Sequence, residues 1–344
     1  MGNRTYTKEE LDAALASMGV TDQTDVSRYG SGHINDTFKV ETTRGVRFIL
    51  QRVNTDIFEP VVLKKNIVRV TEFLKSKGVK SLEVVGYENP WRLYKFLEGY
   101  TSRDVVSEPR QAYDVGRAFA KFQNDLADIP PPRLEDIIPM FHDTPNRLKQ
   151  LDDAATKDVK GRLASVAAEM AFVDSWREKA GRIVGAMATG EIPERVTHND
   201  TKINNVMIDE NGEAVVIDLD TTMPGSALFD FGDMVRTSTA AAAEDEADLS
   251  KVFAKREYFE ALAKGYLEGA KFLNDAERAN LVFAGKLMTF EVGIRFLADY
   301  LAGDVYFHTA YADHNLVRAR NQFQMVRSLE EQTADFEAIV KGLS

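Results

Sequence analysis

The sequence contains no cysteine among its 344 residues. Disulfide bonds, thiolate metal sites and cysteine nucleophiles are therefore excluded. The chain also lacks any apolar run that approaches the length of a membrane span, and its first residues contain no apolar signal segment. These absences are compatible with a reducing compartment, and we expect a cytoplasmic protein that does not bind membranes.

Positive charge is scarce, since 43 lysines and arginines face 54 acidic residues and the net charge is −11. This balance argues against nucleic acid or an anionic membrane as a partner. Hydrophobic residues make up 44% and charged residues 28% of the chain, as in an ordinary folded protein. An anionic ligand would have to be neutralised locally by a metal ion, by backbone N–H groups and by a few basic side chains.

The most informative pattern is an H-x-D-x-x-x-x-N loop at residues 198–205, followed by the strand-like run that ends in Asp218 and Asp220. It resembles the phosphotransfer centre shared by protein kinases, aminoglycoside phosphotransferases and choline kinases. The resemblance implies that Asp200 accepts or orients the acceptor hydroxyl. It also implies that Asn205, Asp218 and Asp220 hold Mg²⁺ against the phosphates of ATP, and oxygen ligands suit this hard cation.

The spacing of these residues agrees with a β-hairpin. The apolar runs 206–208 and 214–217 flank an Asn211-Gly212 pair, which is a strong hairpin signal. If the turn is centred on this pair, Asn205 lies opposite Asp218. Strand alternation would then place Asp218 and Asp220 on the same face. The alternative is a surface hairpin whose acidic residues have no function.

Residues 230–233 spell Asp-Phe-Gly-Asp, which in protein kinases marks the magnesium ligand. The motif comes too late after Asp200 to be that element, and Asp218 occupies the corresponding place. By comparison with aminoglycoside kinases, we expect Asp230 to accept backbone hydrogen bonds from the catalytic loop, or else to cap a helix. His198 is expected to brace the same loop and not to transfer protons.

The order of elements predicts a two-lobed α+β fold of the protein-kinase type. Residues 26–58 read as strands and turns, and residues 82–86 and 91–97 as further strands. A helix is expected at 60–77 with Gly78 as its stop signal, and Thr7 with Glu10 predicts a capped short helix. The chain becomes mostly helical after Gly99. We therefore expect a small antiparallel-sheet lobe that binds nucleotide at residues 1–98, and a large helical lobe that carries the catalytic loop and acceptor site at 99–344.

Two segments of the small lobe are candidates for ATP binding. A Gly-x-Gly at 30–32 is weak alone, but between the first two strands of such a lobe its amides could lie over the phosphates. The third strand has no lysine at the usual phosphate-binding place. Either Gln51 donates a neutral hydrogen bond there or Arg52 supplies the charge, because alternation lets only one of them face the cleft. The candidate nucleotide-binding residues are Gly30, Ser31, Gly32, His33, Asn35, Gln51 and Arg52.

Several blocks together resemble the bacterial N-acetylhexosamine 1-kinases. They are residues 29–37, 49–52, 141–145, 197–202, 217–221, 223–225, 230–233 and 295–301. This resemblance implies ATP- and Mg²⁺-dependent phosphorylation of the anomeric hydroxyl of N-acetylglucosamine or N-acetylgalactosamine. Close relatives could differ in the sugar they use.

Residues 286–301 supply a candidate sugar site. They are apolar on most helical faces, so the helix should be buried, yet Glu291, Arg295 and Asp299 repeat every four residues along one stripe. Buried charges must pair or border a wet cavity. The stripe is either a fork of donors and acceptors for a polyhydroxyl acceptor or a structural ion-pair stripe at the helix surface; for Arg295 we favour the sugar. Tyr300 and Tyr306 could stack on a sugar or belong to the core.

Other functions fit parts of the pattern. The acceptor could be choline, homoserine or an aminoglycoside, but choline would need an aromatic cage and a cationic aminoglycoside an acidic pocket. Arg295 argues against both. A non-catalytic protein that binds ATP or sugar is the other alternative, and the intact Asp200, Asn205 and Asp218 argue against it. His142 is a candidate to line the cleft, and His308 and His314 lack the spacing of zinc ligands.

Overall fold

The computed structural model describes residues 4–30 and 34–343. The chain forms two compact units. Unit 1 consists of Met1–Thr101, Asp128–Pro139 and Met207–Met223, and unit 2 of Ser102–Ala127, Met140–Val206 and Pro224–Ser344. Unit 1 contains an antiparallel sheet and unit 2 is mainly helical, so the expected α+β architecture is confirmed. The functional division at residues 98 and 99 stays a prediction.

The sheet of unit 1 has five antiparallel strands in the order β1-β2-β3-β5-β4. In sequence order the strands are β1 (Gln23–Arg28), β2 (Asp36–Thr42), β3 (Arg47–Arg52), β4 (Val84–Glu88) and β5 (Trp91–Lys95). Phe38 pairs with Leu50, which in turn pairs with Leu93. Since residues directly opposite one another share a face, these three apolar side chains form one row across the sheet.

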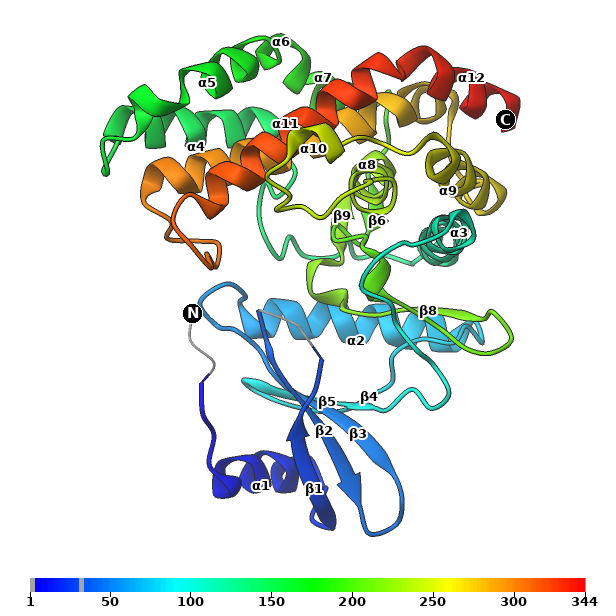
Figure 1. Cartoon of the computed structure of the whole chain (residues 1–344). Helices are drawn as coiled ribbons and strands as arrows, with labels where there is room; N and C mark the ends of the chain where they lie inside the picture. Colours follow the sequence, from blue (N-terminus) through cyan, green and yellow to red (C-terminus); the bar gives the residue numbers. More distant parts are fainter. Residues whose placement is uncertain (1–3, 31–33, 344) are drawn as a thin grey trace. The chain divides into compact units, whose positions relative to one another are not determined.

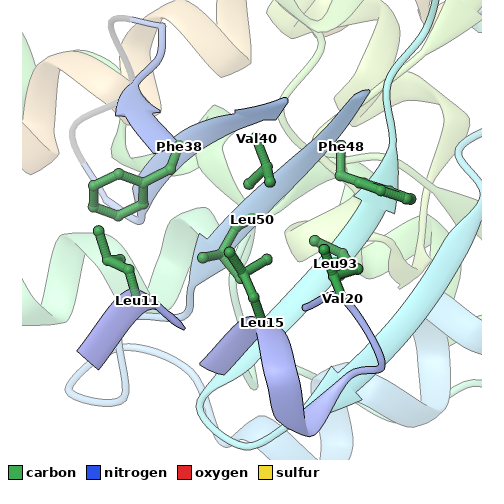
Figure 2. Close-up of a cluster of buried hydrophobic side chains, with 8 residues drawn as sticks. All are labelled: Leu11, Leu15, Val20, Phe38, Val40, Phe48, Leu50 and Leu93. Carbon is green, nitrogen blue, oxygen red and sulfur yellow. The ribbon is translucent and has the colours of Figure 1, made fainter. Parts of the chain in front are cut away.

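Helix α1 (Lys8–Ser17) covers this apolar face. It begins with the expected capping box, in which the Thr7 hydroxyl accepts from the Glu10 N–H and the Glu10 carboxylate accepts from the Thr7 N–H. Figure 2 shows side chains from α1 and from the strands pointing toward each other. The buried members of this core are Leu11, Leu15, Val20, Phe38, Val40, Phe48, Leu50 and Leu93.

Helix α2 (Pro60–Ser76) confirms the helix expected at 60–77. Glu59 caps its first turn by accepting from the N–H groups of Val61 and Val62, and Pro60 suits the first turn because its missing N–H would have no partner there. Gly78 follows the last turn with φ of 71°, a left-handed conformation that glycine adopts without steric cost. The helix therefore starts and stops where local chemistry indicates.

Strands β7 (Val206–Ile208) and β8 (Ala214–Val216) form the expected hairpin, but its turn is one residue longer than predicted. The Asp209 N–H donates to the Glu213 carbonyl, and the Gly212 N–H donates to the Asp209 carbonyl. Gly212 has φ of 80°. This is a three-residue loop that closes with a left-handed glycine. The register expected from a turn centred on Asn211-Gly212 is therefore wrong by one position.

Unit 2 is built around α10, a helix of 28 residues. It packs against α4, α8, α11 and α12, while α3 packs against α9 (Figure 1). The helices are α3 (Pro109–Leu126), α4 (Thr144–Lys157), α5 (Ala167–Asp174), α6 (Arg177–Ala180), α7 (Arg182–Ala188), α8 (Ala227–Ser238), α9 (Arg256–Gly269), α10 (Asp275–Ala302), α11 (His314–Glu331) and α12 (Thr333–Leu343). In the described parts of the chain, no helix combines the length and apolarity needed to cross a membrane.

Helix α8 lies unusually close to α10. A Cβ atom on Gly232 would stand 2.4 Å from the carbonyl oxygen of Ala284, closer than real atoms approach. Glycine at this position therefore lets the two backbones touch. The contact matters because α8 carries Asp230 and Asp233 and α10 carries the predicted acceptor stripe.

Candidate active site

The catalytic loop follows β6 (Arg195–Thr197), which pairs with β9 (Met223–Gly225). A Cβ on Gly225 would stand 2.5 Å from the Thr197 hydroxyl oxygen, so only glycine fits beside this strand. The next turn is tight, because Asn199 has φ of 64°. Asparagine is among the few residues that tolerate this left-handed conformation, which costs energy and persists only where the surroundings enforce it.

Asp230 enforces it. One carboxylate oxygen accepts from the Asn199 N–H at 2.7 Å, and the other accepts from the His198 N–H at 2.9 Å and from Gln123 at 2.6 Å. Asp230 is fully buried, and this burial raises the pKa of its carboxyl group even though His198 and the backbone donors oppose the shift. The expectation that Asp230 braces the loop through backbone hydrogen bonds is confirmed.

A second aspartate on α8 holds the next residue of the loop. The Asp233 carboxylate accepts from the Thr201 N–H at 2.9 Å and from the Arg236 guanidinium, while the Thr201 hydroxyl donates to the Asp230 carbonyl. His198 is buried against the rings of Phe119 and Phe122, and its Nδ1 accepts from the Asp200 N–H at 3.3 Å. The histidine therefore braces the loop, as expected.

Asp200 presents its carboxylate at the end of this braced loop. Oδ1 lies 2.7 Å from the Lys202 ammonium, and Oδ2 accepts from the Asn205 amide nitrogen at 3.1 Å. Burial raises the pKa of this carboxyl group, but the charge and hydrogen bond of Lys202 outweigh it, so the pKa lies below its ordinary value. Asp200 is therefore ionised at neutral pH, in the form that can accept a proton or orient a hydroxyl.

Lys202 is a component that the sequence pattern did not single out. Its ammonium group pairs with Asp200, and this pairing raises the pKa of the lysine. The signal was present, because Lys202 lies within the H-x-D-x-x-x-x-N loop two residues after the aspartate. The sequence motif assigned roles to Asp200 and Asn205 but none to Lys202, which lies between them.

In unit 1 the chain leaves β8 before it reaches the acidic residues. Asp218 has φ of 57°, and Leu219–Thr221 form a 3-10 turn, η3. The expectation that Asp218 and Asp220 share a strand face is therefore wrong. Strand alternation does not apply to a left-handed residue followed by a helical turn.

Asp220 points into the sheet of unit 1 instead. Its two oxygens accept from the Arg92 guanidinium at 2.5 and 2.9 Å, and one of them also accepts from the Asn35 amide at 2.6 Å. Both charged side chains are almost completely buried, with exposures of 1% and 5%. Burial acts to lower the pKa of Arg92, but Asp220 outweighs it and raises that pKa. With both oxygens engaged, Asp220 is not arranged as the metal ligand that the sequence suggested.

Arg92 shares one sheet face with Gln51, since the two residues pair across β3 and β5. The Gln51 amide oxygen accepts from Arg92 at 3.0 Å, and its amide nitrogen donates to the Thr37 hydroxyl at 3.0 Å. Arg52 pairs with Trp91, which packs on the core beneath α1, so it lies on the opposite face. The cation beside Gln51 is therefore Arg92, from a neighbouring strand, and sequence reading missed it.

The glycine loop is only partly described. Gly30 has φ of 77°, which favours glycine. Ser31, Gly32 and His33 lie outside the described residues. Asn35, the next candidate, donates to Asp220 and accepts from the Asn54 N–H at 3.0 Å. Asn35 therefore joins the end of the glycine loop to the Arg92–Asp220 pair.

The candidate ligands for Mg²⁺ are Asn205, Asp218 and Asp220. Among residues 4–30 and 34–343, no group of three acidic or histidine side chains is arranged to hold a metal ion. Mg²⁺ that binds together with nucleotide phosphates needs only one or two protein carboxylates or similar ligands. The Asn205 amide nitrogen donates to the carbonyl and carboxylate of Asp200, which leaves its amide oxygen as the end suited to a cation. Asn205 in unit 2 and Asp218 in unit 1 each carry an oxygen of the kind that suits such a cation, and their joint role as its ligands stays a prediction.

The three residues of the α10 stripe have different surroundings, and Glu291 pairs with a buried partner inside the unit and not at the helix surface. This carboxylate is completely buried and accepts from the Thr144 hydroxyl at 2.7 Å and from His142 Nδ1 at 2.8 Å. Burial alone would raise its pKa, but His142 and Thr144 lower it. Glu291 is therefore engaged within unit 2 and is not arranged to contact an acceptor.

Asp299 has a different internal role. Its carboxylate accepts from the main-chain N–H groups of Val305, Tyr306 and Phe307 and from the Asn315 amide, at distances between 2.8 and 3.0 Å. It anchors the loop that follows α10. As with Glu291, these bonds leave no reason to assign the carboxylate to substrate.

Arg295 is the member of the stripe that stays available. Within the described residues, its guanidinium has no hydrogen bond or ion pair, and it lies over the rings of Phe141 and Phe307, 5.4 and 5.6 Å from their centres. Burial lowers the pKa of nearby Arg147, and Arg295 lowers it further. Unit 2 thus holds two neighbouring cations, and Glu291, a carboxylate that acts on both, is already paired with His142.

The two candidate stacking residues differ in exposure. Tyr300 is buried, and the Arg162 guanidinium lies 4.3 Å from its ring centre, so it belongs to the core. Tyr306 is 56% exposed and its ring meets Phe307 edge to face. Of the two, only Tyr306 has a surface that a sugar could stack on. Its neighbour Phe307 is one of the two rings under the Arg295 guanidinium.

The antiparallel sheet, the helical unit and the braced aspartate loop define a kinase-like phosphotransferase fold. A family comparison agrees. The chain belongs to the APH phosphotransferase enzyme family, whose model matches residues 25–275.

Solved structures with the same fold include three kinases. A choline/ethanolamine kinase family protein from Mesorhizobium loti is 18% identical, with 97% of this chain and 99% of that chain covered and a TM-score of 0.60. Choline kinase LicA from Streptococcus pneumoniae is 12% identical, with 94% and 99% covered and a TM-score of 0.60. Amicoumacin kinase hAmiN, solved with AMP-PNP and Ca²⁺, is 14% identical, with 95% and 94% covered and a TM-score of 0.60. At these identities the likeness concerns the fold.

Proposed function

We propose that this protein is an ATP- and Mg²⁺-dependent sugar kinase that phosphorylates the anomeric hydroxyl of N-acetylhexosamines. The kinase part is supported by family membership and by the ionised Asp200 at the end of a braced loop. The acceptor part is supported by Arg295, whose guanidinium has no hydrogen bond or ion pair among the described residues and lies over two aromatic rings of unit 2. The sequence blocks that resemble N-acetylhexosamine 1-kinases include both residues.

In this proposal Asp200 orients the acceptor hydroxyl and takes its proton, while Lys202 keeps the carboxylate ionised beforehand. Asn205 and Asp218 would hold Mg²⁺, which when bound neutralises charge on the phosphates of ATP. Gly30, Gln51 and Arg92 are the proposed nucleotide-side groups of unit 1, together with Ser31, Gly32, His33 and Asn35. The chain's contribution is mainly to position groups and stabilise charge, as in phosphoryl transfer generally.

The charges of unit 2 favour a neutral acceptor. A cationic acceptor would meet the guanidinium groups of Arg295 and Arg147, whereas the two carboxylates on the same stripe are engaged internally. The rings of Phe141 and Phe307 could form part of a choline cage, but the Arg295 guanidinium already lies over both of them. An acetamido carbonyl and sugar hydroxyls can accept hydrogen bonds from an arginine.

The alternative acceptor class is an amino alcohol. It is favoured by the names of the solved structures, which include choline, ethanolamine and aminopropanol kinases. Those names describe those proteins, and their identities with this chain are low. The decision between the two classes rests on a direct test of acceptors.

The proposed function predicts a sugar 1-phosphate product. ADP release should be measured with N-acetylglucosamine, N-acetylgalactosamine, their methyl glycosides, choline, ethanolamine and homoserine. We expect turnover of the free acetylated sugars only, because a methyl glycoside has no free anomeric hydroxyl. Phosphorus NMR should identify an anomeric phosphate. A 6-phosphate product, or efficient use of the methyl glycoside, would refute the 1-kinase proposal, and turnover of choline alone would support the amino-alcohol class.

Arg295→Ala should raise the KM for the acetylated sugar by roughly 10- to 100-fold, as expected for the loss of a charge-assisted hydrogen bond. The KM for ATP should stay unchanged, since the arginine acts on the acceptor. Arg327→Ala is the matched control, because Arg327 also lies over an aromatic ring, that of Phe172, but is exposed on α11. Equal effects of the two substitutions on sugar KM would argue against an acceptor role for Arg295.

A further inference from the structure

We propose that His142 is a doubly protonated positioning residue that ties helix α10 to the loop carrying Asp200. The kinetic part of this proposal rests on the proposed kinase function, but the protonation part does not. The residues involved are His142, Glu291, Thr144 and Asn199, and all of them lie in unit 2.

The hydrogen-bond partners of the His142 ring are both acceptors. Nδ1 lies 2.8 Å from a carboxylate oxygen of Glu291, and Nε2 lies 3.2 Å from the main-chain carbonyl oxygen of Asn199. A neutral imidazole has one donor and one acceptor nitrogen, so it can satisfy only one of two such acceptors. A ring that donates to both needs a proton on each nitrogen and carries a positive charge.

Glu291 is set up to balance that charge. Its second oxygen accepts from the Thr144 hydroxyl, a contact that favours the carboxylate over the neutral acid. Glu291 is fully buried and the His142 side chain is 6% exposed. A carboxylate in such a place is stable only when it is paired and hydrogen-bonded, and an imidazolium supplies both.

Other charges nearby do not replace this pairing. Arg295 on α10 and Arg147 on α4 are two nearby cations that Glu291 also attracts, and Asp143, at the start of α4, is a nearby carboxylate that attracts Arg147. The remaining neighbours of the ring are the aromatic side chains of Phe141 and, from α8, Phe229. Among these charged groups of the described residues, His142 is the one that is hydrogen-bonded to the Glu291 carboxylate.

The pair acts on the catalytic loop at its strained residue. Asn199 has a left-handed backbone, and its N–H is bound by Asp230 while its carbonyl is bound by His142. Two charged side chains from different elements thus hold the two ends of the residue that precedes Asp200. Glu291 stands one helical turn before Arg295 on α10. His142 consequently connects the proposed acceptor helix to the position of the catalytic carboxylate.

Nitrogen NMR tests the protonation state directly. The chain has five histidines, and the His142 ring signals are identified by their loss in His142→Gln. In the wild-type protein at neutral pH we expect both ring nitrogens to show the shifts of protonated nitrogen. In Glu291→Gln we expect the ring to become neutral, because its counter-charge is gone. A ring with one unprotonated nitrogen in the wild type would overturn the proposal.

Kinetics test the positioning role. His142→Gln should lower kcat by about 10²-fold, the cost of small misplacements of catalytic groups, with little change in the KM for ATP. The matched control is Glu277→Gln, which alters another fully buried, ion-paired glutamate of α10 and should leave kcat unchanged. A lower thermal unfolding midpoint with unchanged kcat in His142→Gln would mean a purely structural role and would overturn the positioning claim.

The kinetic and NMR measurements test the proposed function and the proposal about His142 separately. Absence of turnover with every acceptor would contradict the proposed function, and kcat would then be measured as ATP hydrolysis. The NMR result does not depend on any acceptor, so a doubly protonated His142 in a protein that phosphorylates no sugar would still support the inference about the ring.

Discussion

Asp200→Asn should lower turnover by about 10²- to 10⁴-fold, the usual contribution of a general base. The substitution keeps the shape of the side chain but removes the charge that accepts or orients the acceptor proton. The fold should be retained, because the ion pair with Lys202 is partly exposed, with side-chain exposures of 29% and 42%, and such pairs contribute about 0–1 kcal/mol. Turnover is measured by ADP release and folding by thermal unfolding.

Asp209→Asn provides the control for this experiment. Asp209 is also an aspartate with a lowered pKa, caused first by the Glu213 N–H, but it lies in the β7–β8 turn. The Asp209→Asn substitution should leave turnover near the wild-type value. Near-normal turnover in Asp200→Asn would remove Asp200 from the proposed catalytic role. Because the pKa of Asp200 is below its ordinary value, any loss of activity just below neutral pH should not come from this group.

Asp218→Asn should abolish Mg²⁺-dependent turnover, and excess Mg²⁺ should recover little of it. Asparagine is the better substitution than alanine here, because it tolerates the left-handed backbone at φ of 57° and so removes charge without adding strain. The unfolding midpoint should stay near that of the wild type. A Mg²⁺ titration of turnover is the measurement, and a variant that saturates normally would exclude Asp218 as a ligand.

Asp220→Asn, two residues away, should instead lower the free energy of unfolding. It leaves the Arg92 guanidinium buried without its carboxylate, and breaking a buried pair in this way costs about 3–5 kcal/mol of stability. Adding Arg92→Met should recover part of that loss, because the uncompensated charge is then removed. If Asp220→Asn left the unfolding midpoint unchanged and Asp218→Asn lowered it, our division of roles between the two aspartates would be reversed.

Features set by neighbouring residues were predictable from the sequence. The Thr7–Glu10 capping box, the end of α2 before Gly78 and the existence of the β7–β8 hairpin each depend on a few adjacent side chains. The bracing role of Asp230 was also predicted, but through resemblance to a family. Spacing alone does not reveal which backbone groups a buried carboxylate will meet.

Features set by distant partners were not predictable. Strand alternation failed at Asp218 because the chain leaves β8 after Val216, a break without a local glycine or proline signal. The pairing of Arg92 with Asp220 joins residues far apart in sequence. In the same way, the periodicity that exposed the α10 stripe could not show that Glu291 meets His142.

The anchor at Asp299 has a consequence for how acceptor preference could change over evolution. It holds the loop after α10 through main-chain N–H groups at positions 305–307, which every amino acid except proline possesses. Substitutions at Tyr306, whose ring meets that of Phe307 under Arg295, would therefore alter this surface while the loop kept its attachment. Single substitutions on this surface would therefore change its chemistry without lowering the stability of α10, the helix that carries Asp299.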